Sequence, residues 1–465
     1  MKLHNWGGAG EHGRSCYYIE GENVRLLLDC GVKKEAAGQY PLLDPAKIPE
    51  LDAVFLSHAH DDHAMALPLL YKYGYEGEIW TTRATQRQLR AGFAGWKRFV
   101  EGRGGSLPYD DEHVERMRFR YLEDYALPCG WFELPAAIHA ETGSTAQRTA
   151  AFPQRESRRI RVQWGRTGHL AGSVWLRLEA EGKRIFFSGD YSRESLLLAA
   201  DAPGADSGPD RVLSTPRPFP VRDLPDDLSI VDNAYGSDEE DQVAKLERLG
   251  EEIGRALGEG GAVLLPLPSF GRGQDLLLWA CERFDPYPIA IDGAIWNGLR
   301  DLLEQPLWLR HAASPAIAQR LEQHSHRLLP MDSEETRLAA LEAGGPRLIL
   351  AADGTMESAV SRRYLKTIAD DPRNRVLLTG HVYPGSFADE LLRERVAGVR
   401  CRVRKLNYKV HQGLGDVRAM LDAAPSACTV LVHAPEPSAR RAYEALFGEG
   451  RRGLRLLFPG DVLSF

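Results

Sequence analysis

The stretch Ser57-His58-Ala59-His60-Asp61-Asp62-His63 brings three histidines and two aspartates together in seven residues. Neutral imidazole and carboxylate are ligands of first-row metal ions. In an H-x-H pair both side chains lie on one side of an extended segment, so His58 and His60 can bind one ion. Asp62 and His63 turn the other way and can bind a second. The stretch predicts a two-metal hydrolytic centre. The alternative is a solvated polar turn, but turns favour Asp, Gly, Asn and Pro over alternating histidines.

The residues on either side of this stretch place it between a strand and a helix. The preceding Val54-Phe55-Leu56 is a short apolar run typical of a buried strand, and the following AMALPLLYKYG can begin a helix. The carboxyl end of a strand is the usual position of a site in an α/β protein.

Three further ligand candidates lie at the ends of other expected strands. His169 sits in a glycine-flanked segment before an alternating strand, Asp190 follows Ile185-Phe186-Phe187, and His433 follows the apolar run TVLV. Taken singly, each residue type is more often a core histidine or a turn aspartate. Together they show the pattern of a layered α/β scaffold that gathers one site from several strand ends.

Length and composition indicate a large soluble globular protein. A chain of 465 residues exceeds one ordinary core and predicts two domains or one large composite. No stretch approaches 18 consecutive apolar residues and the first residues lack a signal-peptide pattern, so we expect a cytoplasmic protein without a membrane segment. The six cysteines are scattered without a CxxC pair, which predicts buried thiols in a reducing compartment.

The net charge of −7 excludes nucleic-acid binding through overall charge, so any such binding must use local patches. Arginines crowd into residues 148–166, and Arg158 and Arg159 of this segment are candidate contacts to a nucleic acid. A solvated arginine-rich loop is the alternative. Residues 200–227, which are rich in Pro, Gly and Asp, are predicted to be a connector.

The ordered set of motifs resembles the metallo-β-lactamase superfamily, and in particular its β-CASP branch of nucleic-acid-processing nucleases. The resemblance is carried by HAHDDH, by GHLAGS with His169, by SGD with Asp190 and by LVHAPE with His433. LLLDCGV with Asp29, SIVDNAYG with Asp232 and LNYKVHQGLGD with His411 are similar to further motifs of the branch. The resemblance covers nearly the whole chain.

This resemblance implies an αββα sandwich in residues 1–236 and 410–465, interrupted by a β-CASP cap in residues 237–409. It implies two zinc ions, with manganese as an alternative at the same ligands. His58, His60 and His169 would bind one ion, Asp62, His63 and His433 the other, and Asp190 would bridge them. Asp29 would orient a ligand by hydrogen bonding. Asp62 would orient the attacking water, and His411, held by Asp232, would protonate the leaving oxygen or bind the scissile phosphate.

The implied activity is hydrolysis of phosphodiester bonds in a single-stranded nucleic acid, with RNA favoured over DNA. Asp232 in place of glutamate is similar to the DNA-directed members of the branch, whereas His433 is similar to the RNA-directed members. The alternatives are a DNA nuclease, a small-molecule metallohydrolase such as a lactonase or thioesterase, and a catalytically silent nucleic-acid-binding subunit. The sequence also leaves a homodimer open.

Two loops of the expected cap are similar to phosphate-facing loops of the branch. The first has Asp353-Gly354-Thr355 where relatives have Ser-Gly-Met, and the second carries His381 and Ser386. Because Asp353 would repel a 5′-phosphate, we expect endonucleolytic cutting, or exonuclease action that does not depend on a 5′-monophosphate. The histidines without a partner pattern, including His12, are predicted to be ordinary surface or core residues.

Overall fold

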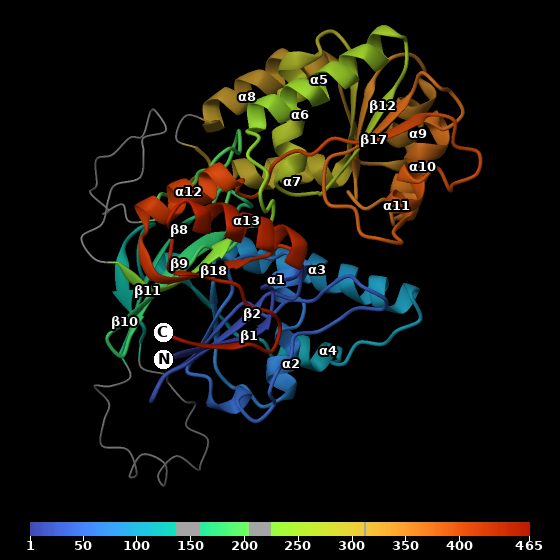
Figure 1. Cartoon of the computed structure of the whole chain (residues 1–465). Coiled ribbons are helices and arrows are strands. Elements are labelled where there is room, and N and C mark those ends of the chain that lie inside the picture. The colour runs from blue at the N-terminus through green and yellow to red at the C-terminus, as the bar shows by residue number, and fades with distance from the viewer. Residues whose placement is uncertain (136–158, 204–224, 311–312) are drawn as a thin grey trace.

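The computed structural model describes residues 1–135, 159–203, 225–310 and 313–465. Figure 1 shows a sandwich of two sheets with helices on its outer faces and, beside it, a third sheet with its own helices, coloured yellow to orange. The sandwich carries both ends of the chain, and the first and last strands pair with each other. This is the αββα architecture with an inserted cap that the sequence predicts.

The sandwich consists of two seven-stranded sheets. The first sheet runs in the order β20 (Val462–Ser464), β1 (Lys2–Gly7), β2 (Cys16–Glu20), β3 (Arg25–Leu28), β4 (Ala53–Phe55), β5 (Ile79–Thr81) and β6 (Phe119–Tyr121). The second runs in the order β19 (Leu454–Arg455), β18 (Ser426–Val432), β11 (Asp226–Asp232), β10 (Lys183–Phe187), β9 (Val174–Ala180), β8 (Ile160–Arg166) and β7 (Trp131–Glu133).

Successive residues of the strands face opposite sides of each sheet and so contribute to different apolar layers of the sandwich. Inward residues such as Phe55 and Ile230 pack between the two sheets, whereas Val54 faces the outer helices. The helices over the first sheet are α1 (Asp61–Ala64), α2 (Leu67–Lys72), α3 (Arg83–Gly102) and α4 (Asp111–Glu115). Those over the second sheet are α12 (Leu414–Ala423) and α13 (Glu436–Gly448).

Helix α3 illustrates how the sequence specifies these layers. Its residues Leu89, Phe93, Trp96 and Val100 recur at helical spacing and are all buried against the first sheet. Thr82 caps the helix, because its hydroxyl accepts a hydrogen bond from the backbone N–H of Thr85. The periodicity and the cap together fix where the helix begins and which face it buries.

The cap is built on a parallel six-stranded sheet. Its order is β14 (Leu328–Met331), β13 (Ile289–Asp292), β15 (Leu348–Ala352), β12 (Val263–Leu267), β16 (Arg375–Leu378) and β17 (Arg402–Lys405). Helices cover both faces of this sheet: α5 (Gln242–Gly258), α6 (Arg272–Arg283), α7 (Gly293–Leu303), α8 (Ala313–Gln323), α9 (Glu334–Glu342), α10 (Ala359–Ile368) and α11 (Phe387–Leu392). All six strands lie between residues 263 and 405, inside the range expected for the cap, whose bounds remain a prediction.

The two crossings between sandwich and cap run side by side. The hydroxyl of Tyr235 donates to the carbonyl of Tyr408 at 3.2 Å and accepts from the backbone N–H of Val410 at 3.0 Å. The backbone N–H of Leu414 donates to the carbonyl of Asp238 at 2.8 Å. The cap is therefore inserted through one narrow joint, at the edge of the sandwich where β11 and β18 end.

Asp275 of α6 is a second fastening between the cap and the sandwich. Its buried carboxylate accepts hydrogen bonds from the hydroxyl of Ser195 at 2.9 Å, the backbone N–H of Leu197 at 3.1 Å and the hydroxyl of Tyr408 at 2.8 Å. Burial raises the pKa of Asp275 from 3.8 to about 6 despite these bonds. The folded protein therefore holds a proton here more tightly than the unfolded chain does.

A raised carboxyl pKa predicts how Asp275 changes stability with pH. Its protonation stabilises the fold fully below about pH 4, and this contribution is lost as the pH rises through about 6. Relative to Asp275→Asn, the wild type should therefore lose about 1 kcal/mol between pH 5 and pH 7.5. The measurement is the difference in thermal stability of the two proteins at each pH, with the exposed Asp370→Asn as a control. A rise in the stability of the wild type relative to Asp275→Asn as the pH increases would contradict the assignment.

Three sequence predictions concern features outside the site. All six cysteines are free and buried, as the scattered pattern predicts. Within the described ranges, the structure contains no helix with the length and apolar character needed to span a bilayer. Most of the predicted connector, residues 200–227, lies outside the described residues.

Candidate metal centre

The ligand candidates meet because the strands that precede them end at one edge of the sandwich. Strands β10, β11 and β18 are parallel, and Asp190, Asp232 and His433 occupy or follow their carboxyl ends. In the first sheet, Asp29 and His58 follow the parallel strands β3 and β4. Parallel strands present their carboxyl ends at the same edge, which is how residues hundreds of positions apart form one site.

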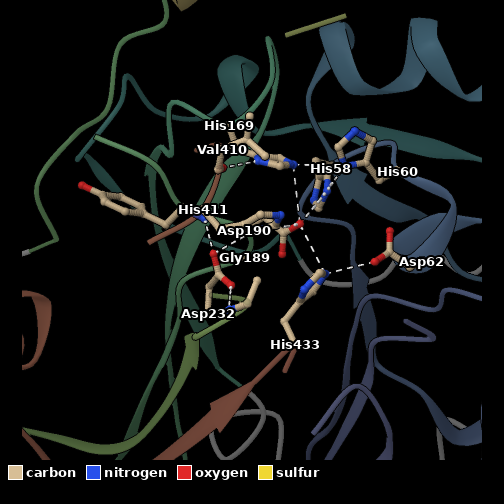
Figure 2. A network of polar contacts seen from close by, with 12 residues as sticks. His58, His60, Asp62, His169, Gly189, Asp190, Asp232, Val410, His411 and His433 are labelled. Carbon is tan, nitrogen blue, oxygen red and sulfur yellow. Dashed lines mark hydrogen bonds and ion pairs between the residues drawn. The ribbon is translucent and has the colours of Figure 1, made fainter. Parts of the chain in front are cut away.

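Three imidazoles and one carboxylate form the first group of the centre. His60 Nδ1 lies 3.1 Å from His58 Nε2 and 3.0 Å from His169 Nε2. Asp190 Oδ2 lies 3.3 Å from His58 Nε2 and 3.5 Å from His169 Nε2. Their ligand atoms all lie within 4.8 Å of one another, and Figure 2 shows the rings turned toward Asp190. This is the set that the sequence assigns to one ion.

The second predicted group is linked through the same aspartate. His433 Nε2 lies 3.0 Å from Asp62 Oδ2 and 3.5 Å from Asp190 Oδ2. His63 Nε2 lies 3.3 Å from Asp190 Oδ1 and 3.9 Å from Asp62 Oδ2. Two other groupings are equally compact, one of Asp190, Asp232, His411 and His433 and one of His12, Asp62 and His433. The second ligand set therefore remains a proposal among related sets.

Hydrogen bonds behind the ligands fix their orientation. Asp29 Oδ2 contacts His63 Nδ1 at 2.6 Å and accepts from the hydroxyl of Ser57, while Oδ1 accepts from the Ser57 backbone N–H. His169 Nδ1 contacts the carbonyl of Val410 at 2.7 Å. Each contact leaves the Nε2 atom of the histidine facing the centre, as metal-binding histidines require. Asp29 makes the contact that its predicted role needs, and the role itself remains a proposal.

The backbone at the centre is held in unusual conformations. Asp29 and His433 adopt left-handed backbone angles, with φ of 58° and 69°. Non-glycine residues in this region carry strain and gather at functional sites. Gly31 allows the loop after β3 to pass the motif, because a Cβ atom there would lie 1.8 Å from the carbonyl oxygen of Asp62.

The donor set fits a divalent cation. Burial, followed by the influence of His63, lowers the pKa of His58 to about 3, and burial lowers the pKa of His60 and His169 well below the ordinary value. These three imidazoles are therefore neutral, the form that binds metal, and their nitrogens converge on one point with the Asp190 carboxylate. The buried Nε2 of His63 and Nδ1 of His433 also lack a hydrogen-bond partner among the described residues.

The electrostatics of the second group also favour a bound cation. Burial lowers the pKa of His433, but Asp190 and Asp62 outweigh burial and raise it to about 9. The same carboxylates raise the pKa of His63 against its burial. The carboxylates of Asp190 and Asp62 thus favour a positive charge beside His63 and His433. A bound metal ion would provide that charge while both histidines stay unprotonated at the nitrogens that face it.

His411 and Asp232 form a pair at the side of the centre. His411 Nδ1 lies 3.0 Å from Asp232 Oδ2 and 3.8 Å from Asp190 Oδ2. The Asp232 carboxylate also accepts from the backbone N–H groups of Tyr191 and Ala234. Asp232 is thus held by backbone donors and orients the ring, and His411, like His60, is half-buried, whereas His58, His63, His169 and His433 are buried. The pair has the geometry of an oriented acid–base histidine.

Two sequence families match this chain. The model of the Metallo-beta-lactamase superfamily matches residues 9–144, and that of the Beta-Casp domain matches residues 277–391. The chain belongs to the β-CASP branch of the metallo-β-lactamase superfamily. The metallo-β-lactamase match contains the HAHDDH motif, and the β-CASP match lies within the cap.

Curated relatives of this family resemble the chain over most of its length. It is 27% identical to the Transcription termination factor FttA of Methanothermobacter thermautotrophicus, over 83% of this chain and 57% of that protein. It is 25% identical to the Endoribonuclease YSH1 of Candida albicans, over 97% of this chain and 50% of that protein. The chain thus spans about half the length of these relatives. It is 24% identical to the Probable RNase MJ4 of Methanocaldococcus jannaschii, over 93% of both chains.

A solved structure supports the fold. A protein of unknown function from Enterococcus faecalis V583 matches with a TM-score of 0.55 and 12% identity, over 99% of both chains. At this identity the likeness concerns the fold alone. The two chains therefore share an overall fold along nearly their whole length.

The β-CASP domain adds a cluster of rings beside the metal ligands. His381 of the second cap loop lies 4.6 Å, centroid to centroid, from both His12 and Tyr383. His12 in turn lies 4.6 Å from the His433 ring, with Nδ1 3.4 Å from the His433 carbonyl oxygen. The structure thus places His12 at the centre, although its sequence context predicts an ordinary histidine. No local spacing signals this, because its partners are about 400 positions away.

The other predicted cap residues have bonds within their own loops. Asp353 Oδ1 accepts from the backbone N–H and hydroxyl of Thr355, and Oδ2 accepts from the backbone N–H of Ser358. These bonds satisfy the hydrogen-bonding capacity of the carboxylate but leave its charge, so its repulsion of a phosphate stays a prediction. The hydroxyl of Ser386 caps α11 by accepting from Asp389 N. Roles of Asp353, Gly354, His381 and Ser386 in substrate binding remain predictions.

The predicted arginine patch is partly outside the described residues. Arg148, Arg155 and Arg158 lie there, so the patch as a whole has no structural account. Its three described members each lie beside an acid: Arg159 by Glu133, Arg161 by Glu179 and Arg166 by Asp201. These acids offset the charges only in part, because Glu179 also pairs with Arg184 and Arg159 is largely exposed, so a role of this segment in substrate binding stays a prediction.

Proposed function

We propose that this chain is a metal-dependent nuclease that hydrolyses phosphodiester bonds in single-stranded RNA. The observation that carries the proposal is the convergence of seven ligand residues on one edge of the sandwich with the His411–Asp232 pair beside them. Relatives named as endoribonuclease and RNase support RNA as the substrate, and one of them matches over 93% of its own length.

The proposed metal content is two zinc ions, with manganese able to use the same ligands. His58, His60 and His169 would hold the first ion, Asp62, His63 and His433 would hold the second, and Asp190 would be shared by both. When bound, the cations would supply Lewis acidity toward water and the phosphate. The nitrogen and carboxylate donors of this set are those that zinc prefers.

The remaining steps belong to side chains of this chain. Asp62 orients the attacking water. His411 carries a proton on Nδ1, which faces Asp232, and its second ring nitrogen gives a proton to the leaving oxygen or contacts the scissile phosphate. The pair thus acts on the substrate while the metal ligands hold the reacting groups in place. We propose internal cutting, or exonuclease action that does not depend on a 5′-monophosphate, because Asp353 in the first cap loop would repel a 5′-phosphate.

Purified protein should cut single-stranded RNA more rapidly than DNA of the same sequence. The test uses matched RNA and DNA oligonucleotides, each with a 5′-hydroxyl or a 5′-monophosphate, and resolves the products by length. Internal fragments from both RNA forms, abolished by a chelator, are the expected result. Cutting of DNA alone would contradict the RNA assignment, and stepwise mononucleotide release only from 5′-monophosphate RNA would contradict the endonuclease assignment. Turnover of a chromogenic lactam or thioester without any cut oligonucleotide would favour a small-molecule hydrolase.

A further inference from the structure

Arg272, the first residue of α6, is a half-buried cation without a charged partner. Among the described residues, no carboxylate lies within ion-pair distance of its guanidinium, and its buried Nε has no hydrogen-bond acceptor. Among the more deeply buried arginines, Arg177 pairs with Asp226, and Arg375 pairs with Glu252 and Glu259. Arg347 has no acidic partner among the described residues either, but its guanidinium donates to the carbonyls of Gly345 and Leu341. A partly buried charge without such partners is costly, and an anion would offset that cost.

The surroundings of Arg272 suit an anionic ligand. Burial lowers the pKa of Arg272, and the phenols of Tyr235, Tyr408 and Tyr383 only partly oppose this effect. An arginine nevertheless stays charged in proteins. It begins a helix of 12 residues whose N-cap, Gly271, provides no side-chain cap, so the helix terminus adds positive potential at the same place.

Two of these tyrosines connect Arg272 to the metal centre. The ring of Tyr235 packs edge-on against His411 at 5.5 Å, and the ring of Tyr383 packs against His381 at 4.6 Å. The start of α6 lies beside the metal centre, because a Cβ atom at Gly271 would lie 3.2 Å from the carbonyl oxygen of His169. Gly380 of the second cap loop leaves room for the guanidinium, because a Cβ atom there would lie 2.2 Å from Arg272 Nη1.

We propose that Arg272 binds a backbone phosphate of the substrate strand next to the linkage that is cut. The planar guanidinium offers parallel N–H donors to two phosphate oxygens, which an ammonium group cannot match. The inference rests on the proposed nuclease function and adds the residue that fixes the strand beside the metals. Arg272 differs from Arg159, Arg161 and Arg166, which each lie beside an acid, because no carboxylate of the described residues pairs with it.

The test compares wild type and Arg272→Met on single-stranded RNAs that each carry one uncharged methylphosphonate linkage. With wild type, neutralising one internal linkage near the cut should lower the cleavage rate at limiting RNA by about ten-fold. Arg272→Met should lose a similar factor on unmodified RNA and lose nothing further at that linkage. Its salt dependence of binding should also weaken by about one phosphate contact. Arg283→Met, which removes the same charge from the exposed far end of α6, should match wild type.

Two further readouts separate binding from a structural role. Removing an unpaired buried charge should leave the melting temperature of Arg272→Met equal to or above that of wild type, whereas removing a structural arginine would lower it. Gly380→Ala keeps the charge but displaces the guanidinium, and should reproduce the loss at the same linkage. Arg272→Lys should recover only part of the rate.

The possible failures are distinguishable. Wild type that cuts RNA with a methylphosphonate profile identical to that of Arg272→Met would overturn the inference alone. A loss confined to RNA with a 5′-monophosphate would assign Arg272 to the terminal phosphate and overturn the backbone assignment. A wild type that neither binds nor cuts any oligonucleotide would overturn the proposed function, and the inference with it.

Discussion

Replacement of Asp190 by alanine should remove the metal from the centre and lower nuclease turnover by about a thousand-fold or more. Asp190 lies within 3.5 Å of one nitrogen of each of four histidines: His58, His63, His169 and His433. Loss of a residue that only orients a metal ligand lowers metal affinity by roughly ten- to a hundred-fold. Loss of the Asp190 carboxylate, which several histidines share, should lower metal affinity by more. The measurements are metal content by mass spectrometry and cleavage of the RNA oligonucleotide.

The control for Asp190→Ala is Asp61→Ala, which tests the neighbouring acid of the HAHDDH motif. Asp61 faces away from the ligands and contacts Lys34 Nζ at 2.6 Å, so its loss should leave the metal content close to that of wild type. Equal metal loss in both variants would mean that general acidity of the motif, and not the bridging position of Asp190, holds the ions.

The ligand candidates were accessible from the sequence because they depend on local features. The residue types and spacing of HAHDDH indicate metal binding by themselves. Asp190 and His433 follow apolar runs that are typical of buried strands in an α/β fold. Parallel pairing then brings the strand ends together without further information. The architecture followed from the same strand pattern together with the family motifs, and the sandwich and cap are arranged as that combination predicts.

The residues that the sequence did not reveal owe their position to contacts between the sandwich and the cap. The ring of His12 contacts that of His381, which belongs to the cap. Arg272 is the first residue of a helix, and its sequence context does not indicate whether an acidic side chain pairs with it. Whether a charged side chain has an ion-pair partner depends on three-dimensional contacts, so composition cannot show it. Conversely, the dense arginine segment suggested a basic surface, whereas its described members have acidic neighbours that no one-dimensional count could pair.

Asp353 shows the same limit for a single substitution. Its type predicts repulsion of a phosphate, and only the structure shows that the carboxylate already accepts three hydrogen bonds from its own loop. Whether a charged residue acts on a ligand depends on which groups have already engaged its charge. This argues for testing cap residues by substrate chemistry, as with methylphosphonates, and not by residue type alone.

His411→Ala should lower turnover by about a hundred- to ten-thousand-fold while the metal content stays at the wild-type level. The reason is that the ring is oriented by Asp232 at 3.0 Å, whereas its distance from Asp190 Oδ2 is 3.8 Å. The result also decides between two groupings, because His411, Asp232, Asp190 and His433 are close enough to hold an ion themselves. If His411 were a ligand, its removal would release metal in proportion to the lost activity.

Asp232→Asn sharpens this prediction, because it preserves shape but removes the negative charge that holds the Nδ1 proton of His411. Its turnover should fall between those of wild type and His411→Ala, and the double variant should be no slower than His411→Ala, since the two residues act as one unit. His113→Ala, at a histidine paired with Asp110 on α4 outside the centre, should retain wild-type turnover. Near-normal turnover in His411→Ala with full metal content would show that protonation of the leaving oxygen does not depend on this histidine.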